Sequence, residues 1–220
     1  MPGWQAVYEK LGDQNFEIVS VAQDTGGLEA AGEFYDAAAA TYTTLIDVGH
    51  TVSSLYNMTN VPTGLWIDEE GVIVRPNEVA YSKNVDFGNG AIAVNGDDYV
   101  AALADWVEHG SESRHAMTPE EIVGRLRSPD DDEAMADASF KLAVYLYQNG
   151  DPERANALWD KAQTLRPESW NYHRQDWSFL STEEAGQNWR QKFEALEGEP
   201  YYAPLILEED KARRYHERSR

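Results

Sequence analysis

The segment NVPTGLWIDEEGVIV, residues 60–74, decides the fold of the first half of the chain. Two apolar runs, residues 64–68 and 72–75, flank an acidic turn at 68–71, a pattern that predicts a β-hairpin. Pro62 stands just before the first run. Because proline has no N–H to donate to a strand ladder, it belongs at the first residue of a strand or in a turn. The segment therefore predicts a strand entrance at Pro62 followed by two antiparallel strands.

Helices and strands alternate on either side of this hairpin. Trp4, Val7, Tyr8 and Leu11 share one helical face, which predicts a short helix at the start of the chain. The other predicted elements are a buried strand over 16–22, a helix over 28–38, a strand over 42–46, a short helix over 52–56, a small hairpin around 88–90 within the mostly irregular segment 76–96, and a helix over 99–107 capped by Asp97 or Asp98. This alternation favours an α/β fold.

Residues 1–109 resemble a thioredoxin fold, and in particular the TlpA/ResA branch of the AhpC/TSA redoxins. The resemblance rests on the triplet Val61-Pro62-Thr63, on the Ile-Asp-x-x-Gly hairpin at 67–71 and on the order of the upstream elements. In that family the triplet carries a cis-proline and faces a reactive dithiol, and the backbone before the proline pairs with a substrate peptide. The resemblance implies that Val61, Pro62 and Thr63 face the substrate.

The alternative for Pro62 is an ordinary trans-proline at a strand entrance. A cis X–Pro bond costs only about 0.5–1 kcal/mol, so a tertiary fold can select it. We expect the cis form.

The chain departs from the family in two ways. It contains no cysteine, and the strand and Cys-x-x-Cys motif that precede the first helix in the family have no counterpart before Met1-Pro2. That strand lies centrally in the family's sheet, between those matching 16–22 and 64–68. An incomplete thioredoxin-like sheet is therefore expected, with two inner edges whose N–H and C=O groups lack a partner.

Three explanations of this departure remain open from the sequence. The reading frame begins earlier, which we favour, or a partner supplies the strand, or the sheet has closed again in a degenerate relative. Even a restored upstream segment need not contain cysteines, since some relatives of this kind lack them.

Everything after Glu133 is predicted to be helical, so the fold class is α/β followed by an all-α helical hairpin region. Gly150-Asp151-Pro152 ends one helix and starts the next, with Asp151 as the cap and Pro152 in the first turn. The spacing resembles a tetratricopeptide repeat; the residues that carry it are Leu142, Ala143, Leu146, Gly150, Ala155, Trp159, Ala162 and Pro167. Ser139 stands where that repeat usually has tryptophan, and a generic helical hairpin is the equal alternative.

The expected domain organisation follows from these patterns. Residues 1–110 form the thioredoxin-like domain, 111–132 a polar linker, 133–198 the helical region and 199–220 a tail whose last ten residues carry a net charge of +4.

Composition limits the partners. The 220 residues contain 18 Lys and Arg against 39 Asp and Glu, which gives a net charge of −21. Such a polyanion is repelled by nucleic acid and anionic lipid, so neither is an expected partner, whereas a protein or peptide is. No apolar run is long enough to span a membrane and no export signal is present, so a cytoplasmic location is expected, although relatives are often exported. Oligomeric state is left open.

No side-chain pattern points to a metal, cofactor or catalytic group. The histidines His50, His109, His115, His173 and His216 have no metal-binding spacing, so solvated or capping roles are expected. Residues 130–133 lack the alternation of a calcium loop and predict a solvated helix start. Trp170, Arg174 and Trp177 share a helical face; burial of a seam between helices and sheet is favoured over a ligand cage.

The resemblance implies thiol–disulfide or peroxide chemistry, but this chain supplies no thiolate to carry it out. We therefore expect a redoxin-family protein that is redox-inactive as given. The alternative is a non-enzymatic peptide- or protein-binding module that uses the cis-proline loop and the helical region.

Overall fold

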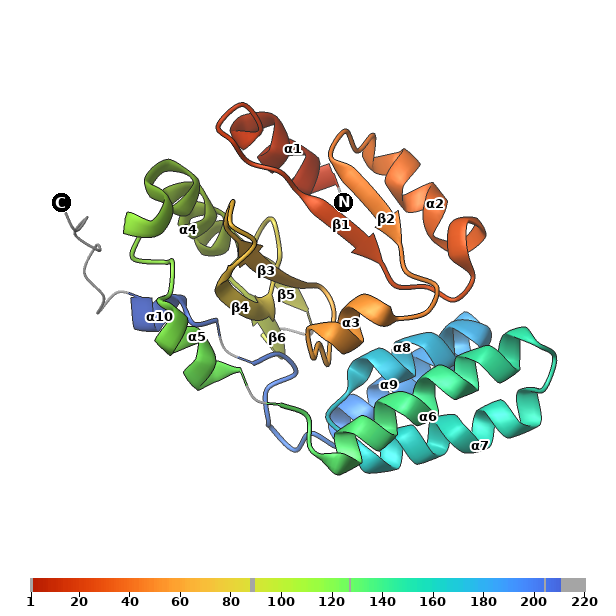
Figure 1. Cartoon of the computed structure of the whole chain (residues 1–220). Coiled ribbons are helices and arrows are strands. Elements are labelled where there is room, and N and C mark those ends of the chain that lie inside the picture. Colours follow the sequence, from red (N-terminus) through yellow and green to blue (C-terminus); the bar gives the residue numbers. More distant parts are fainter. Residues whose placement is uncertain (1, 88–89, 127, 204, 211–220) are drawn as a thin grey trace.

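The computed structural model describes residues 2–87, 90–126, 128–203 and 205–210. An α/β half and a helical half lie side by side, and the chain then returns to the α/β half near its C-terminus (Figure 1). The mixed α/β and all-α character expected from the sequence is confirmed. No described helix is both long and apolar enough to cross a membrane.

The α/β half follows the predicted order of elements. Its elements are α1 (Pro2–Leu11), β1 (Val19–Ala22), α2 (Gly27–Ala38), β2 (Thr43–Ile46), α3 (Thr51–Leu55), β3 (Thr63–Ile67), β4 (Ile73–Val79), β5 (Val85–Phe87), β6 (Ile92–Val94) and α4 (Gly96–His109). One cap differs from expectation. Asn95, rather than Asp97 or Asp98, caps α4, because its side-chain oxygen accepts the Asp98 N–H at 3.3 Å.

The described strands form three separate two-stranded sheets. β1 and β2 are parallel, with Val21 opposite Leu45, whereas β3–β4 and β5–β6 are antiparallel. Both predicted hairpins are therefore confirmed, although the turn at 88–89 lies outside the described residues.

The core of this half lies between β3–β4 and the helices α1 and α4. Trp66 of β3 donates through Nε1 to the Tyr99 hydroxyl at 2.9 Å and stacks on Trp106 at a centroid distance of 5.2 Å. A side chain at Gly64 would bring its Cβ within 2.8 Å of that hydroxyl, so Gly64 lets Tyr99 approach the sheet. The hairpin predicted from residues 60–74 thus supplies the centre of the core.

The segment expected to be a linker, 111–132, instead packs on the sheet. It contains η1 (Gly110–Glu112) and α5 (Pro119–Arg125), and Ala116, Met117 and Ile122 are buried. The Met117 N–H donates to the Val74 carbonyl of β4 at 2.7 Å. The apolar residues of this polar segment explain the difference, because they reach the open face of β4.

The helical half contains α6 (Asp131–Gln148), α7 (Pro152–Leu165), α8 (Trp170–Asp176), η2 (Trp177–Phe179) and α9 (Thr182–Glu194). Asp151 caps α7 by accepting the Arg154 N–H, and Pro152 is its first residue, as predicted. Four alanines at the α6–α7 contact have no exposed surface: Ala136, Ala143, Ala155 and Ala162. Small side chains let the two helices approach closely, which confirms the helical hairpin.

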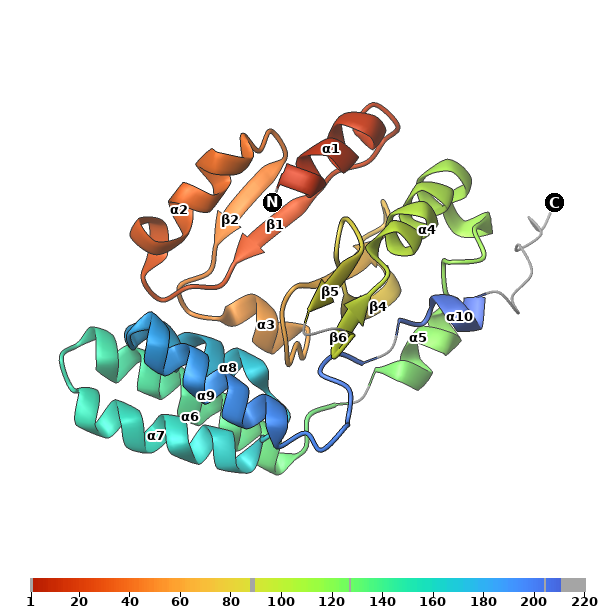
Figure 2. The same cartoon turned by 180° about the vertical axis from the view of Figure 1, so that it is seen from behind.

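The segment after α9 is not a solvated tail as far as residue 210. Tyr201, Ile206 and Leu207 are buried, and α10 (Leu207–Asp210) lies beside α5 in both views (Figures 1 and 2). The apolar character of these side chains explains the difference, since the α/β core covers them. The basic run in 211–220 lies outside the described residues.

Candidate functional site

The cis-proline loop, residues 57–63, connects α3 to β3. The Val61–Pro62 peptide bond is cis, as predicted, and Pro62 lies directly before β3. The Asn60 side-chain oxygen accepts the Val61 N–H at 2.9 Å, and the Thr63 hydroxyl donates to the Asn60 carbonyl at 2.6 Å. The three residues predicted to face a substrate are therefore together on one turn, and each is half-buried.

Residues 166–174 of the helical half contact this loop residue by residue. The Trp170 and Asn171 N–H groups donate to the Thr59 carbonyl at 2.7 and 3.1 Å. The remaining bonds run from Arg166 Nη2 to Asn57 Oδ1 at 2.6 Å, from Asn171 Nδ2 to the Met58 carbonyl at 2.8 Å, and from Arg174 Nη2 to Asn60 Oδ1 at 3.0 Å. The helical half thus already binds the cis-proline loop of its own chain.

The Val61 carbonyl accepts two further hydrogen bonds. Arg174 Nη2 and the Tyr202 hydroxyl each donate to it at 3.0 Å. Burial is the main reason that the pKa of Tyr202 is raised, so this hydroxyl remains a donor at neutral pH. Because Asn60 occupies the Val61 N–H, both backbone polar groups of Val61 are satisfied within the chain. A substrate peptide could pair with the Val61 backbone, as the resemblance implies, only by displacing the Asn60 side chain from the N–H or Arg174 and Tyr202 from the carbonyl.

β1 and β3 each have one hydrogen-bonding edge to which no described strand is paired. β1 pairs only with β2 and β3 only with β4. In both views β1 lies between β2 and the β3–β4 pair (Figures 1 and 2). Within the described residues, β1 and β3 therefore belong to separate sheets.

One face of the β1–β2 pair is also poorly covered. The register puts Val19, Val21 and Leu45 on the same face, and Val19 and Leu45 are 57% and 49% exposed. Parallel strands are usually buried on both faces. The pair therefore exposes apolar surface as well as a free edge.

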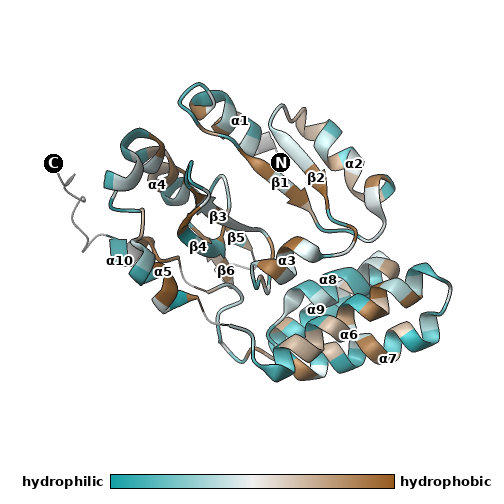
Figure 3. Cartoon of the chain, viewed as in Figure 1, coloured by the Kyte–Doolittle hydropathy of each residue, from teal (hydrophilic) through white to brown (hydrophobic). Residues whose placement is uncertain are grey.

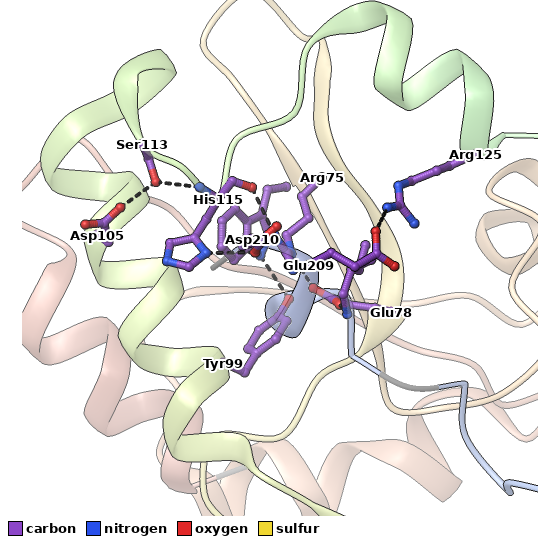
Figure 4. Close-up of polar contacts among 11 residues, drawn as sticks. Arg75, Glu78, Tyr99, Asp105, Ser113, His115, Arg125, Glu209 and Asp210 are labelled. Atoms are coloured by element: carbon purple, nitrogen blue, oxygen red, sulfur yellow. Dashed lines mark hydrogen bonds and ion pairs between the residues drawn. The ribbon is translucent and has the colours of Figure 1, made fainter. Parts of the chain in front are cut away.

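A second polar cluster, missed by the sequence analysis, is buried beneath the C-terminal segment (Figure 4). Arg75 of β4 has no exposed surface and forms ion pairs with Glu78 and Asp210. Its Nη1 lies 2.8 Å from Asp210 Oδ2 and donates to the His115 carbonyl at 2.9 Å. The His115 imidazole Nδ1 also lies 2.8 Å from Asp210 Oδ2.

Charge pairing decides the ionisation of this cluster. Burial alone would lower the pKa of Arg75, but Glu78 and Asp210 outweigh burial and leave that pKa above its usual value. The guanidinium therefore stays charged and holds the C-terminal segment on β4. Glu78 adds to this attachment, because its Oε2 accepts the Ile206 N–H at 3.0 Å.

The cluster does not have the geometry of a serine hydrolase. The Ser113 hydroxyl donates to Asp105 Oδ2 at 2.6 Å and accepts the backbone N–H of His115 at 3.1 Å, while the imidazole Nδ1 faces Asp210. Nucleophilic catalysis needs a hydrogen bond between the hydroxyl and the imidazole. Ser113 and His115 make no such bond, so we interpret the cluster as a structural joint.

Three histidines differ from the solvated or capping role expected for them. His115 pairs with Asp210, His50 is buried between the two halves, and His173 is half-buried and stacks on Trp177. His50 Nε2 lies 2.9 Å from Gln175 Oε1 and 3.3 Å from the Thr25 hydroxyl. Burial lowers the pKa of His50, opposed by the hydrogen bond to Gln175 and by nearby carboxylates. His50 therefore belongs to the contact between the halves, and His216 lies outside the described residues.

The other side chains considered from the sequence have structural roles. Asp130 and Glu133 form a capping box at the start of α6, although Glu133 is buried rather than solvated and faces Arg166 at 3.6 Å. Within the described residues, no group of three or more acidic, histidine or cysteine side chains is arranged to hold a metal. Trp170 is buried with Tyr201 in the seam between the halves, as favoured from the sequence.

Comparisons with known proteins add no name to these features: no family model, no curated protein and no solved structure matches this chain. The resemblances to a redoxin and to a tetratricopeptide repeat therefore rest on the residues and the order of the elements alone.

Proposed function

We propose that this chain is a thioredoxin-like binding module that accepts an extended peptide strand between β1 and β3. In this proposal the tetratricopeptide-like helices hold the cis-proline loop in place and do not themselves recruit the partner. The proposal assigns no thiol chemistry to the chain, because it has no cysteine.

The observation that carries the proposal is the pair of strand edges without a described strand partner. Exposed edges present rows of N–H and C=O groups, and addition of a strand to such an edge is a common mode of peptide recognition. The exposed apolar side chains of Val19 and Leu45 lie on a strand pair that a neighbouring strand would extend. The same surface would favour an occupant with apolar side chains.

The other two surfaces considered from the sequence are less suitable. Both backbone groups of Val61 are occupied by Asn60, Arg174 and Tyr202. Residues 166–174 are themselves occupied by the cis-proline loop. The cis-proline loop and residues 166–174 already use each other's hydrogen-bonding groups, so an external peptide would form few new hydrogen bonds at either surface.

Hydrogen–deuterium exchange tests the proposal on the full chain. The probe is a synthetic peptide of alternating valine and threonine with a lysine at each end, since lysine suits a protein of charge −21. We expect slower exchange in residues 19–22 and 63–67 together. The hairpin β5–β6, which also has only two strands, is the internal control and should not change.

A second peptide, with a proline at its central position, cannot donate a full ladder of hydrogen bonds and should protect neither strand. Protection of only one strand, of none, or equal protection by the proline peptide would refute strand insertion.

A second candidate is the redox activity that the resemblance at Val61-Pro62-Thr63 implies. The purified chain is expected to reduce neither insulin disulfides nor peroxides with any thiol donor, because it supplies no thiolate. Turnover above the buffer rate that is lost in Pro62→Ala would favour this candidate over the binding module.

A further inference from the structure

A small cavity of about 10 Å³ lies where α3 of the α/β half meets α6 and α8 of the helical half. Figure 3 colours much of α8 as hydrophilic, and the contact of Gln175 in this helix with His50, just before α3, makes the junction polar. The cavity walls include His50, Asp137, Arg166, Asn171 and Tyr172. No residue of β1 or β3 lines the cavity, so the inference does not rest on the proposed strand insertion.

The hydrogen bonds of Gln175 decide which nitrogen of His50 carries the proton. Gln175 Oε1 accepts the Thr25 N–H at 2.9 Å, and Gln175 Nε2 donates at 2.9 Å to the Ser178 hydroxyl, whose own proton goes to the Gln175 carbonyl. Because Oε1 is an acceptor, His50 Nε2, 2.9 Å away, is the donor. Burial lowers the pKa of His50, opposed by the bond to Gln175 and by nearby carboxylates, so the imidazole is neutral at neutral pH. Its Nδ1 therefore carries a lone pair and accepts a hydrogen bond.

Two acceptors on residues that line the cavity have no donor among the described residues. One is His50 Nδ1 and the other is Asn171 Oδ1. The Asn171 amide is oriented by its Nδ2, which donates to the Met58 carbonyl at 2.8 Å. His50 and Asn171 are only 4% and 5% exposed, so bulk solvent does not reach them. Buried polar groups are nearly always hydrogen-bonded, to protein or to ordered water, because an unmet acceptor costs free energy.

The occupant therefore has to supply two donors within the volume of one water molecule. Two charged residues in the walls are already paired: Asp137 with Lys141 at 3.1 Å and Arg166 with Glu133 at 3.6 Å. These pairs leave little attraction for a small cation, and the buried Arg166 guanidinium repels one. A neutral molecule is favoured.

We propose that this cavity binds a single long-lived water molecule, which donates one hydrogen bond to His50 Nδ1 and one to Asn171 Oδ1. Buried waters typically make about three hydrogen bonds. The Tyr172 hydroxyl can donate the third to the water oxygen, since burial is the main reason that its pKa is raised to about 12 and the proton is kept. The water joins α3 to α8 and is part of the contact between the two halves.

A crystal structure of the full chain tests the position of this water. We expect an ordered oxygen within about 3.2 Å of both His50 Nδ1 and Asn171 Oδ1. An empty cavity, or an oxygen that contacts only one of the two acceptors, would overturn the proposal.

Nuclear magnetic resonance of the full chain tests its lifetime and the tautomer of His50. We expect a contact between the His50 ring protons and a slowly exchanging water, and a nitrogen shift of Nδ1 typical of an unprotonated acceptor. The His109 side chain, 41% exposed, is the internal control and should contact only rapidly exchanging water. A protonated Nδ1, or rapid exchange at both rings, would contradict the assignment.

A matched pair of variants tests the second acceptor. Asn171→Leu removes Oδ1 but keeps the His50 ring as the reporter, and should lose the slow water contact. Asn156→Leu makes the same change at an exposed position of α7 outside the cavity and should keep it. Persistence of the contact in Asn171→Leu would refute the bridge. If that variant does not fold, the crystal structure and the spectra of the unmodified chain decide.

The nature of the occupant is tested by exchanging sodium chloride for ammonium chloride at equal ionic strength. A bound water predicts the same melting temperature in both salts. A higher melting temperature in ammonium chloride would identify a cation as the occupant and overturn the proposal, because a ligand that binds the folded state stabilises it. None of these results affects the strand-insertion experiment.

Discussion

The helical hairpin α6–α7 and the parallel pair β1–β2 differ greatly in how far their side chains are buried. In the hairpin, four alanines and Phe140 are almost completely buried. In β1 and β2, four residues each, none of the eight is buried. The apolar side chains of the helical hairpin are covered by neighbouring elements of the chain. The strand pair instead has one backbone edge without a strand partner and one apolar face that is partly exposed.

The difference follows from how each element meets its hydrogen-bonding needs. A helix satisfies its backbone internally and needs only one apolar stripe to be covered. A strand forms half of its backbone hydrogen bonds with each neighbouring strand, and parallel strands are also usually buried on both faces. The absence of one neighbour therefore leaves more unmet hydrogen bonds and exposed apolar surface in a sheet than in a helical bundle.

The largest expected effect is in the helical half. Phe140→Ala should lower the free energy of unfolding by about 3–5 kcal/mol, because it leaves a cavity among Tyr172, His50 and the α6–α7 alanines. Leu45→Ala in β2 should change it by less than about 0.5 kcal/mol, since Leu45 is half exposed. Urea unfolding measures both. Similar losses for the two variants would show that β1–β2 is covered in solution.

The buried joint between Arg75 and Asp210 should have the next largest effect. Asp210→Asn leaves the Arg75 guanidinium with one ion-pair partner fewer and should cost about 3 kcal/mol of stability. Glu209→Gln removes the neighbouring, exposed ion pair with Arg125 and should cost less than about 1 kcal/mol. If Glu209→Gln costs as much as Asp210→Asn in thermal unfolding, the C-terminal segment is not held by the buried joint.

The smallest expected effect is a dependence of stability on pH through His50. Its pKa in the folded protein is below the usual 6.5, so below that pH the unfolded chain binds more protons than the folded chain. Stability should therefore fall as the pH drops below about 6.5. The carboxylates near it, Asp47, Asp24 and Asp137, oppose this shift without reversing it.

The His50→Gln variant should lose part of this acid sensitivity, whereas His109→Gln, at an exposed position, should keep it. Unfolding at pH 7.5 and pH 5.5, about one unit either side of that value, measures the difference. An unchanged slope in His50→Gln would mean that other groups cause the acid sensitivity.

Local signals in the sequence predicted the elements well. Pro62 placed the entrance of β3, and Gly150-Asp151-Pro152 placed the turn between α6 and α7, because the chemistry of these residues restricts their own backbone. The hairpin at residues 64–75 followed from its two apolar runs and the acidic turn between them.

Long-range contacts could not be predicted in the same way. Arg75 pairs with Asp210, which is 135 residues away, and Arg174 bonds to Val61 across 113 residues. Neither spacing leaves a periodic pattern in the sequence. One signal was available: an arginine within the apolar strand at 72–75 has to find a buried counter-charge.

The bonds between residues 166–174 and the cis-proline loop, the contacts of His50 with Gln175 and the return of α10 to β4 mean that the two halves are joined at several places besides the peptide chain between α5 and α6. If the backbone were cut between α5 and α6, these contacts would hold the two fragments together. The contacts between the two halves therefore do not depend on an unbroken peptide chain between α5 and α6.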